Sequence, residues 1–134
     1  MVGDGGMEIR AWEPRDGEAV QRLLWLLPDE ALIRADDAPV YVAESAGSVV
    51  GMVTLCVFTT LTGPKALLDH LVVAPESRRR GVGRALVRHA IEQARAAGAS
   101  RVDLTAGRQK QAGRALYESL GFRERNTGAF RLDL

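Results

Sequence analysis

The feature that most constrains the fold is the stretch from Leu71 to Leu86, where an apolar run ends, a basic loop follows and a helix begins. The run up to Ala74 is typical of a buried strand, and Pro75 ends it. Three arginines and two glycines separated by one residue then open the helix. This order places main-chain N–H groups and the positive end of a helix dipole around one small cavity. Such a cavity suits a phosphate group.

Length and composition predict a single water-soluble domain. We expect it to cover residues 7–134 of the 134, after a disordered lead-in at 1–6. No apolar run approaches the roughly 20 residues that cross a bilayer, so no membrane association is expected. The single Cys56 excludes an internal disulfide and fits the cytoplasm. The two histidines and this cysteine lack the spacing of a metal site, so no metal is expected.

The net charge of +1 conceals two sections of opposite sign. Residues 1–77 carry 5 basic and 12 acidic side chains, whereas residues 78–114 carry 10 basic and 2 acidic ones. The basic section is suited to an anion, although two solvated faces of opposite sign would show the same pattern. A nearly neutral total argues against general nucleic-acid binding, which needs a basic surplus over the whole domain.

The remaining patterns predict an α/β (α+β) fold with a mixed, mostly antiparallel central sheet flanked by helices. Asp16 is expected to cap a helix that reaches Leu27, and two further helices are expected at 82–98 and 111–120. Residues 28–39 are expected to form a loop or a short helix, and Trp12 and Trp25 to lie in the core. The strands are expected at 7–12, 40–44, 48–60, 66–73 and 101–105, with a closing hairpin at 122–125 and 129–133.

Two common phosphate-binding folds do not fit. A Rossmann fingerprint needs three glycines and repeated strand–helix–strand units, and here the two-glycine element occurs once. The GxxxxGK[ST] pattern of a P-loop is absent. What remains is Arg-x-x-Gly-x-Gly at 78–83, and further on Ala115-Leu116-Tyr117-Glu118-Ser119-Leu120-Gly121-Phe122.

At these residues the chain resembles the GNAT superfamily of acetyl-coenzyme A dependent N-acetyltransferases. Residues 78–83 resemble the family's pyrophosphate loop, and 116–122 its C-terminal signature. The order of elements also agrees over residues 7–134. The resemblance implies that two neighbouring strands, 66–73 and 101–105, part to admit the cofactor arm. It further implies acetyl-coenzyme A as cosubstrate and a primary amine of a small molecule or peptide as acceptor, attacking directly.

The resemblance also assigns the residues that would hold acetyl-coenzyme A. Main-chain N–H groups near the two glycines would hold the pyrophosphate, because a Cβ there would push the backbone away from the phosphate oxygens. The edge of the preceding strand would pair with the amides of the pantetheine arm. Lys110 stands where family members often have Asn, so it either reaches a phosphate or faces solvent. The expected cofactor-binding residues are Leu71, Val72, Val73, Arg78, Arg79, Arg80, Gly81, Val82, Gly83, Arg84, Lys110 and Tyr117.

Acetyl transfer needs a neutral amine, a stabilised oxyanion and a protonated leaving thiol. Tyr117 is the expected general acid, since the family places a tyrosine beside the sulfur and a phenol suits a departing thiolate. A half-buried tyrosine packing against Phe122 is the structural alternative. Asp69 is the expected base, directly or through water, with His70 as the alternative. Adjacent strand residues face opposite ways, so only one should face the cleft. The N–H of Val73 can polarise the thioester carbonyl.

The acceptor and the assembly are less constrained. The acidic cluster within 28–39 suggests an acceptor that arrives as a cation. The alternating apolar residues of the last expected strand can pair across a two-fold axis, so a homodimer is expected to be possible. A noncatalytic coenzyme A binding module is the alternative function. Nucleic-acid binding through residues 78–80 is a third, which predicts binding to DNA that falls steeply with salt.

Overall fold

The computed structural model describes residues 6–27, 39–106 and 109–134. In this part of the chain, five strands form one sheet in the order β1-β2-β3-β4-β5. The first three pairings are antiparallel and β4 runs parallel to β5. The strands are β1 (Glu8–Ala11), β2 (Val40–Ser45), β3 (Ser48–Thr60), β4 (Gly63–Val73) and β5 (Val102–Asp103). The predicted fold class is therefore confirmed.

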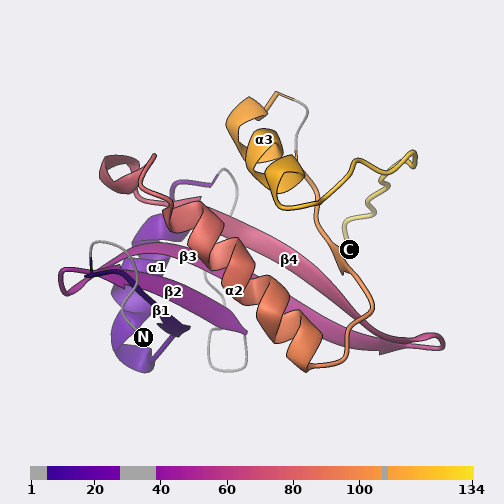
Figure 1. Ribbon diagram of the computed structural model, residues 1–134, viewed down its shortest axis with the longest axis horizontal. Coiled ribbons are helices and arrows are strands. Elements are labelled where there is room, and N and C mark those ends of the chain that lie inside the picture. The colour runs from indigo at the N-terminus through magenta and orange to yellow at the C-terminus, as the bar shows by residue number, and fades with distance from the viewer. Residues whose placement is uncertain (1–5, 28–38, 107–108) are drawn as a thin grey trace.

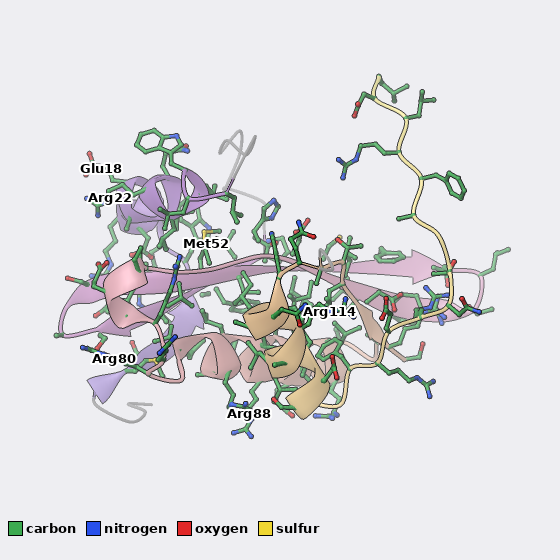
Figure 2. The ribbon with its side chains drawn as sticks, turned by 90° about the horizontal axis from the view of Figure 1, so that it is seen from above. Glu18, Arg22, Met52, Arg80, Arg88 and Arg114 are labelled. Atoms are coloured by element: carbon green, nitrogen blue, oxygen red, sulfur yellow. The ribbon has the colours of Figure 1, made fainter. Side chains whose placement is uncertain are left out.

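Helices cover both faces of the sheet (Figures 1 and 2). α1 (Gly17–Leu24) lies on one face, and α2 (Val82–Ala96) and α3 (Gln111–Ser119) lie on the other. Each was predicted to within a few residues from helical spacing. No helix in the described ranges is long and apolar enough to cross a bilayer.

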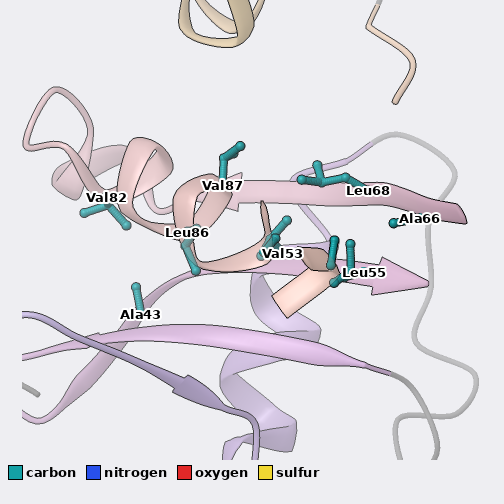
Figure 3. Close-up of a cluster of buried hydrophobic side chains, with 10 residues drawn as sticks. Ala43, Val53, Leu55, Ala66, Leu68, Val82, Leu86 and Val87 are labelled. Carbon is teal, nitrogen blue, oxygen red and sulfur yellow. The ribbon is translucent and has the colours of Figure 1, made fainter. Parts of the chain in front are cut away.

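The main core lies between α2 and the sheet (Figure 3). The packing is so close that a Cβ on Gly51 would lie 3.0 Å from side-chain atoms of both Leu86 and Val82. A second cluster joins α1 to the other face, where Met52 points toward the helix (Figure 2). The buried residues of the main core are Ala43, Val53, Leu55, Ala66, Leu68, Val82, Leu86, Val87, Ala90 and Ala94.

Asp16 stands at the N-cap of α1, but its side chain does not cap that helix as predicted. Its carboxylate accepts hydrogen bonds from Nη1 and Nη2 of Arg10, at 2.7 and 3.0 Å, and from the N–H of Glu13. Arg10 also donates to Glu44 at 2.6 Å. These bonds lower the pKa of Asp16 and tie the start of α1 to β1 and β2. The carboxylate therefore stabilises the docking of the helix.

Three further predictions differ from the structure. Residues 122–134 are all described and form no strand, so the closing hairpin is wrong. Their alternating pattern fits a half-buried strand, yet the segment leaves the body and no strand pairs with it (Figure 2). The expected strand at 101–105 is reduced to Val102–Asp103. Trp25 is not in the core as predicted: it is 69% exposed and stands at the C-cap of α1.

Two predictions fall on parts of the chain outside the described residues. These are the lead-in at 1–6, except for Gly6, and the acidic segment at 28–39, except for Pro39.

Candidate active site

The candidate site begins where β4 and β5 part. The parallel pairing consists of Ala66 with Val102 and Leu67 with Asp103, supported by a bond from the Ala66 N–H to the Arg101 carbonyl. β4 continues for six residues beyond Leu67, and over this stretch no described residue pairs with its outer edge. The other edge stays paired with β3 through Val73. The result is an opening between the two strands, as predicted.

The open edge of β4 presents main-chain groups that face away from β3. The Ala74 N–H donates to the Val50 carbonyl at 2.8 Å, so Ala74 faces β3. Backbone groups alternate along a strand, and those of Val73 and Leu71 therefore face the opening while those of Val72 face β3. Arg78 confirms this direction for Val73, because its Nε donates to the Val73 carbonyl at 3.3 Å.

The loop after β4 has the backbone conformation of an anion site. Arg79 and Gly81 both have positive φ, of 65° and 80°, on either side of Arg80, which does not. Alternation of this kind turns successive N–H groups toward one side and forms a nest for an anion. The conformation at Gly81 is the one that glycine adopts without strain. Gly81 is also the N-cap of α2, so the loop leads directly into the positive end of the helix dipole.

The first turn of α2 adds free N–H groups. Ala85 donates to the Gly81 carbonyl, which leaves the N–H groups of Val82, Gly83 and Arg84 without partners inside the helix. A Cβ on Gly83 would meet Leu116 Cδ2 at 3.4 Å and Val73 Cγ2 at 3.7 Å, which are ordinary contacts. The packing around Gly83 therefore has room for a Cβ, and the glycine leaves this position in the first turn of α2 without a side chain.

The basic side chains around the loop have different roles. Arg79 and Arg80 are exposed, and Figure 2 shows Arg80 beside the start of α2. Arg84 instead donates to Ser119 Oγ at 2.9 Å and connects α2 to α3. Val82 is buried in the core. Arg84 and Val82 can therefore contribute only their backbone, whereas the exposed arginines can contribute charge.

A β-bulge interrupts β4 beside the opening. Thr54 pairs with Asp69 and Met52 pairs with Val72, so two residues of β4 face one residue of β3. His70 has a φ of 49°, which a non-glycine residue rarely adopts and which is concentrated at functional sites. Sequence reasoning missed this bulge. The only signal was a pair of adjacent polar residues, Asp69 and His70, within an apolar run.

The bulge overturns the expectation that Asp69 and His70 face opposite ways, whereas which of them faces the cleft stays a prediction. Asp69 lies directly opposite Thr54, on the sheet face that carries α1. His70 Nδ1 lies 3.0 Å from Thr54 Oγ1, so its ring lies on the same face. The Asp69 carboxylate also accepts a hydrogen bond from the His70 N–H at 2.8 Å. Strand alternation fails here because the bulge adds an extra residue.

Tyr117 reaches this region from α3. Its ring packs edge-on against Phe122, with 5.8 Å between centroids, as the structural alternative predicted. Burial raises the pKa of Tyr117, and the negative charge of Asp69 raises it further. The second effect shows that the two side chains are near each other although they lie on different elements. Tyr117 therefore remains protonated at neutral pH and can donate a proton.

A cavity of about 510 Å³ extends from Tyr117 along the outer side of β5. Leu67, Leu104 and Phe122 give it apolar walls, and residues 123–125 and 127–129 close one side. It therefore connects the parting strands with the segment after α3. Lys110 lies exposed at the start of α3, where no hydrogen bond connects its side chain to the helix end. Its predicted contact with the cofactor stays a prediction.

Metal ligands do not gather in the described residues: no group of three His, Cys, Asp or Glu side chains is arranged to hold an ion.

Comparison with known proteins shows the relatives of this chain. The model of the acetyltransferase (GNAT) family matches residues 7–122. N-acetyltransferase family 8 member 3 of Rattus norvegicus is 45% identical over 92 residues, which cover 67% of this chain and 40% of the rat protein. The [ribosomal protein bS18]-alanine N-acetyltransferase of Escherichia coli K12 is 35% identical over 74 residues, covering 55% of this chain and 50% of that protein. The chain thus spans about half or less of these relatives.

A solved structure shares the fold over almost its whole length. The ribosomal-protein-alanine N-acetyltransferase of Brucella melitensis biovar Abortus 2308 superimposes with a TM-score of 0.77 and 25% identity. The match covers 96% of this chain and 99% of that one. The parted strands and the loop before α2 therefore belong to a fold that solved acetyltransferases share.

Proposed function

Because this chain belongs to the acetyltransferase (GNAT) family, we propose that it transfers an acetyl group from acetyl-coenzyme A to a primary amine of a small molecule or peptide. The proposal depends above all on one observation. The open half of β4 leads directly into a loop and helix start with outward N–H groups. A long ligand with amides at one end and a diphosphate at the other matches this sequence of groups.

The loop and the first turn of α2 would hold the diphosphate. Its negative charge would lie against the nest at Arg79–Gly81 and the N–H groups of Val82, Gly83 and Arg84. Arg79 and Arg80 would add positive charge from the exposed side. The attraction of the N–H groups and of the two arginines for the diphosphate should be stronger at low salt, because exposed charges are screened over about 10 Å at 0.1 M salt.

The pantetheine arm would add to the open edge of β4 as a short extra strand. Its amides would pair with the outward groups of Leu71 and Val73, while Val72 keeps the strand fixed to β3. Arg78 already donates to the Val73 carbonyl, so an entering amide N–H would replace that guanidinium. The displaced Arg78 is then free to approach the diphosphate. The N–H of Val73 would polarise the thioester carbonyl.

The reaction requires two proton transfers. The amine nitrogen attacks the thioester carbonyl carbon, and its proton passes to Asp69, directly or through water. The carbon–sulfur bond then breaks, and Tyr117 gives its phenolic proton to the departing thiolate. Its raised pKa keeps that proton in place until the sulfur becomes basic. His70 lies on the same face as Asp69 and is the alternative base.

The free energy of deprotonation favours some acceptors over others. A lysine amine with a pKa of about 10.4 costs about 4 to 5 kcal/mol to present neutral at pH 7, whereas an α-amino group costs about 1 kcal/mol. The E. coli relative is named for an alanine of ribosomal protein bS18. A peptide α-amino group or a small amine of similar basicity is therefore the favoured acceptor class.

Release of free thiol from acetyl-coenzyme A in the presence of a panel of amines tests this function. We expect release with at least one amine, and in Tyr117→Phe a loss of turnover without a loss of acetyl-coenzyme A affinity. Binding of acetyl-coenzyme A without release for any amine would instead indicate the noncatalytic module. Failure to bind it at all would contradict both functions.

We also propose a homodimer in a cytoplasmic setting, without nucleic-acid or membrane partners. Phe130, Leu132 and Leu134 alternate with charged residues and are almost fully exposed, and β5 is an edge strand of the described sheet. A second copy could supply that edge. The lone free Cys56 fits a reducing compartment. Sedimentation of the full chain, with and without residues 129–134, tests the dimer, and a monomer at all concentrations would contradict it.

A further inference from the structure

An apolar strip lies on the α1 face of the sheet, beyond the end of α1. Cys56, Phe58 and Leu67 form this outer strip: Cys56 pairs directly with Leu67, and Phe58 follows Cys56 at the next position of β3 on the same face. Alternation decides the face, because Leu55 and Leu68 point into the core beneath α2 while their neighbours point the other way.

The outer strip is open to solvent in the described structure. Phe58 is 43% exposed and Leu67 is 42% exposed, and Cys56 is also exposed. α1 covers this face only nearer the other end of the sheet, where it packs on Met52 and Val72. Exposed apolar side chains that stand alone need no explanation, but three adjacent ones on a strand pair form a surface on which an apolar group can lie.

The outer strip is continuous with the reacting centre. Leu67 lines the same cavity as Tyr117, and it forms the last pair with β5 before the strands part. Asp69 lies two residues further along β4 on the same face, which places it about 7 Å from Leu67 along the strand. An amine that reacts beside Asp69 would therefore extend its substituent across the strip or into solvent.

We propose that the outer strip binds the apolar part of the acceptor, so that the preferred amines carry an alkyl or aryl group about 7 Å from the nitrogen. This inference rests on the proposed acetyl transfer. Charge supports the orientation, because Asp69 attracts the ammonium end and the strip offers nothing to a second charge. A diamine of equal length would have to place a cation on Phe58 and Leu67, so it is a poor acceptor.

The test compares hexylamine with ethylamine and with 1,5-diaminopentane, the diamine of equal chain length, in the thiol-release assay with the full chain. A fully buried methylene contributes about fourfold to binding, and a methylene on a half-open surface about twofold. The four extra methylenes of hexylamine should therefore raise kcat/KM about 15-fold over ethylamine. The diamine should not exceed ethylamine.

One double variant and one matched control assign the effect to the outer strip. The double variant Phe58→Ser, Leu67→Ser should reduce the hexylamine-to-ethylamine ratio to below about 3, and a ratio is unaffected by a general loss of active enzyme. Val57→Thr is the control: Val57 is 40% exposed on the same strand but lies on the opposite face. It should leave the ratio at the wild-type value.

The outcomes separate this inference from the function on which it rests. Thiol release that is equal for all chain lengths, or a ratio that the double variant leaves unchanged, overturns the inference and leaves acetyl transfer intact. Absence of release with these amines and with every amine of the panel described above counts against the function. Calorimetry in the presence of coenzyme A then tests the strip, because hexylamine should bind about 15-fold more tightly than ethylamine. A different outcome is that the strip is a contact between copies of the protein. Self-association that the double variant abolishes, together with thiol release that does not depend on the length of the amine, would show this and overturn the inference.

Discussion

The two halves of β4 have the same kind of sequence but different neighbours. Its first half is paired on both edges, with β3 and with β5, and Ala66 and Leu68 are buried beneath α2. Its second half is paired with β3 alone, and there the backbone groups of Leu71 and Val73 face the opening. The closed half thus stabilises the fold, and the open half presents unused backbone groups to a ligand.

The bulge at His70 marks the boundary between the two halves. It adds one residue to β4, so that Asp69 and His70 share a face while Leu71 and Val73 still pack toward α2. The polar pair is thereby brought to the α1 face without exposing the core. One strand can therefore carry both structural and chemical roles. If it does, a substitution in one half of β4 should leave the role of the other half unchanged.

The largest expected effect comes from Tyr117→Phe, which tests the chemistry of the open half. Loss of a general acid should lower kcat by about 10² to 10⁴. The ring and its contact with Phe122 remain, so stability and acetyl-coenzyme A affinity should stay within about twofold. Stopped-flow thiol release and calorimetry measure the two quantities. A kcat within threefold of wild type would exclude this role.

In the closed half, Leu68→Ala should affect stability and not binding. Truncating a buried leucine removes about 2 to 5 kcal/mol of unfolding free energy, and Leu68 is buried. The adjacent Leu67 is the matched control, because it lies on the exposed face and its truncation should cost less than about 1 kcal/mol. Urea unfolding gives both values. Equal losses would contradict the assignment of the two faces.

Gly83→Ala should weaken acetyl-coenzyme A binding by about tenfold while leaving the fold stable. The added Cβ would meet Leu116 and Val73 at ordinary contact distances, but Gly83 belongs to the helix turn whose N–H groups the diphosphate needs, so a closer approach of the diphosphate is expected with glycine. Calorimetry and thermal unfolding compare the variant with wild type. Unchanged affinity would indicate that the diphosphate lies elsewhere.

The smallest effect concerns the electrostatic link between β4 and α3. The charge of Asp69 disfavours the phenolate of Tyr117 and so raises its pKa. Asp69→Asn removes that charge, and the pKa of Tyr117 should fall. Absorbance titration of the phenolate, with Tyr117→Phe to identify the signal, measures the change. A pKa that stays constant or rises would show that the two groups do not interact.

The sequence predicted those parts of the molecule whose structure depends on local pattern. The helical spacing after residue 81 and the alternation in β3 and β4 are local properties, and both gave the correct elements. Phe130 and Leu132 also alternate, but alternation does not provide a partner, and no strand forms there. The capping prediction for Asp16 missed Arg10, because a charge on the preceding strand β1 binds the carboxylate in place of the helix N–H groups.

The candidate site divides in the same way, into parts that the local sequence encodes and parts that depend on tertiary packing. The glycine loop is encoded locally, and its backbone conformation at Arg79 and Gly81 agrees with a phosphate nest. The proximity of Tyr117 to Asp69 depends on how α3 packs against the parted strands, which no local pattern encodes. The placement of His70 beside Asp69 depends on a bulge that only the pairing with Thr54 reveals.

Amide hydrogen exchange with and without saturating acetyl-coenzyme A tests the central claim most directly, because it reports both binding and location. The claim predicts slower exchange for the N–H groups of Leu71, Val73 and residues 79–84, and no change for residues 65–68 of the same strand. Unchanged exchange across 71–84 under conditions in which the ligand is bound would contradict it.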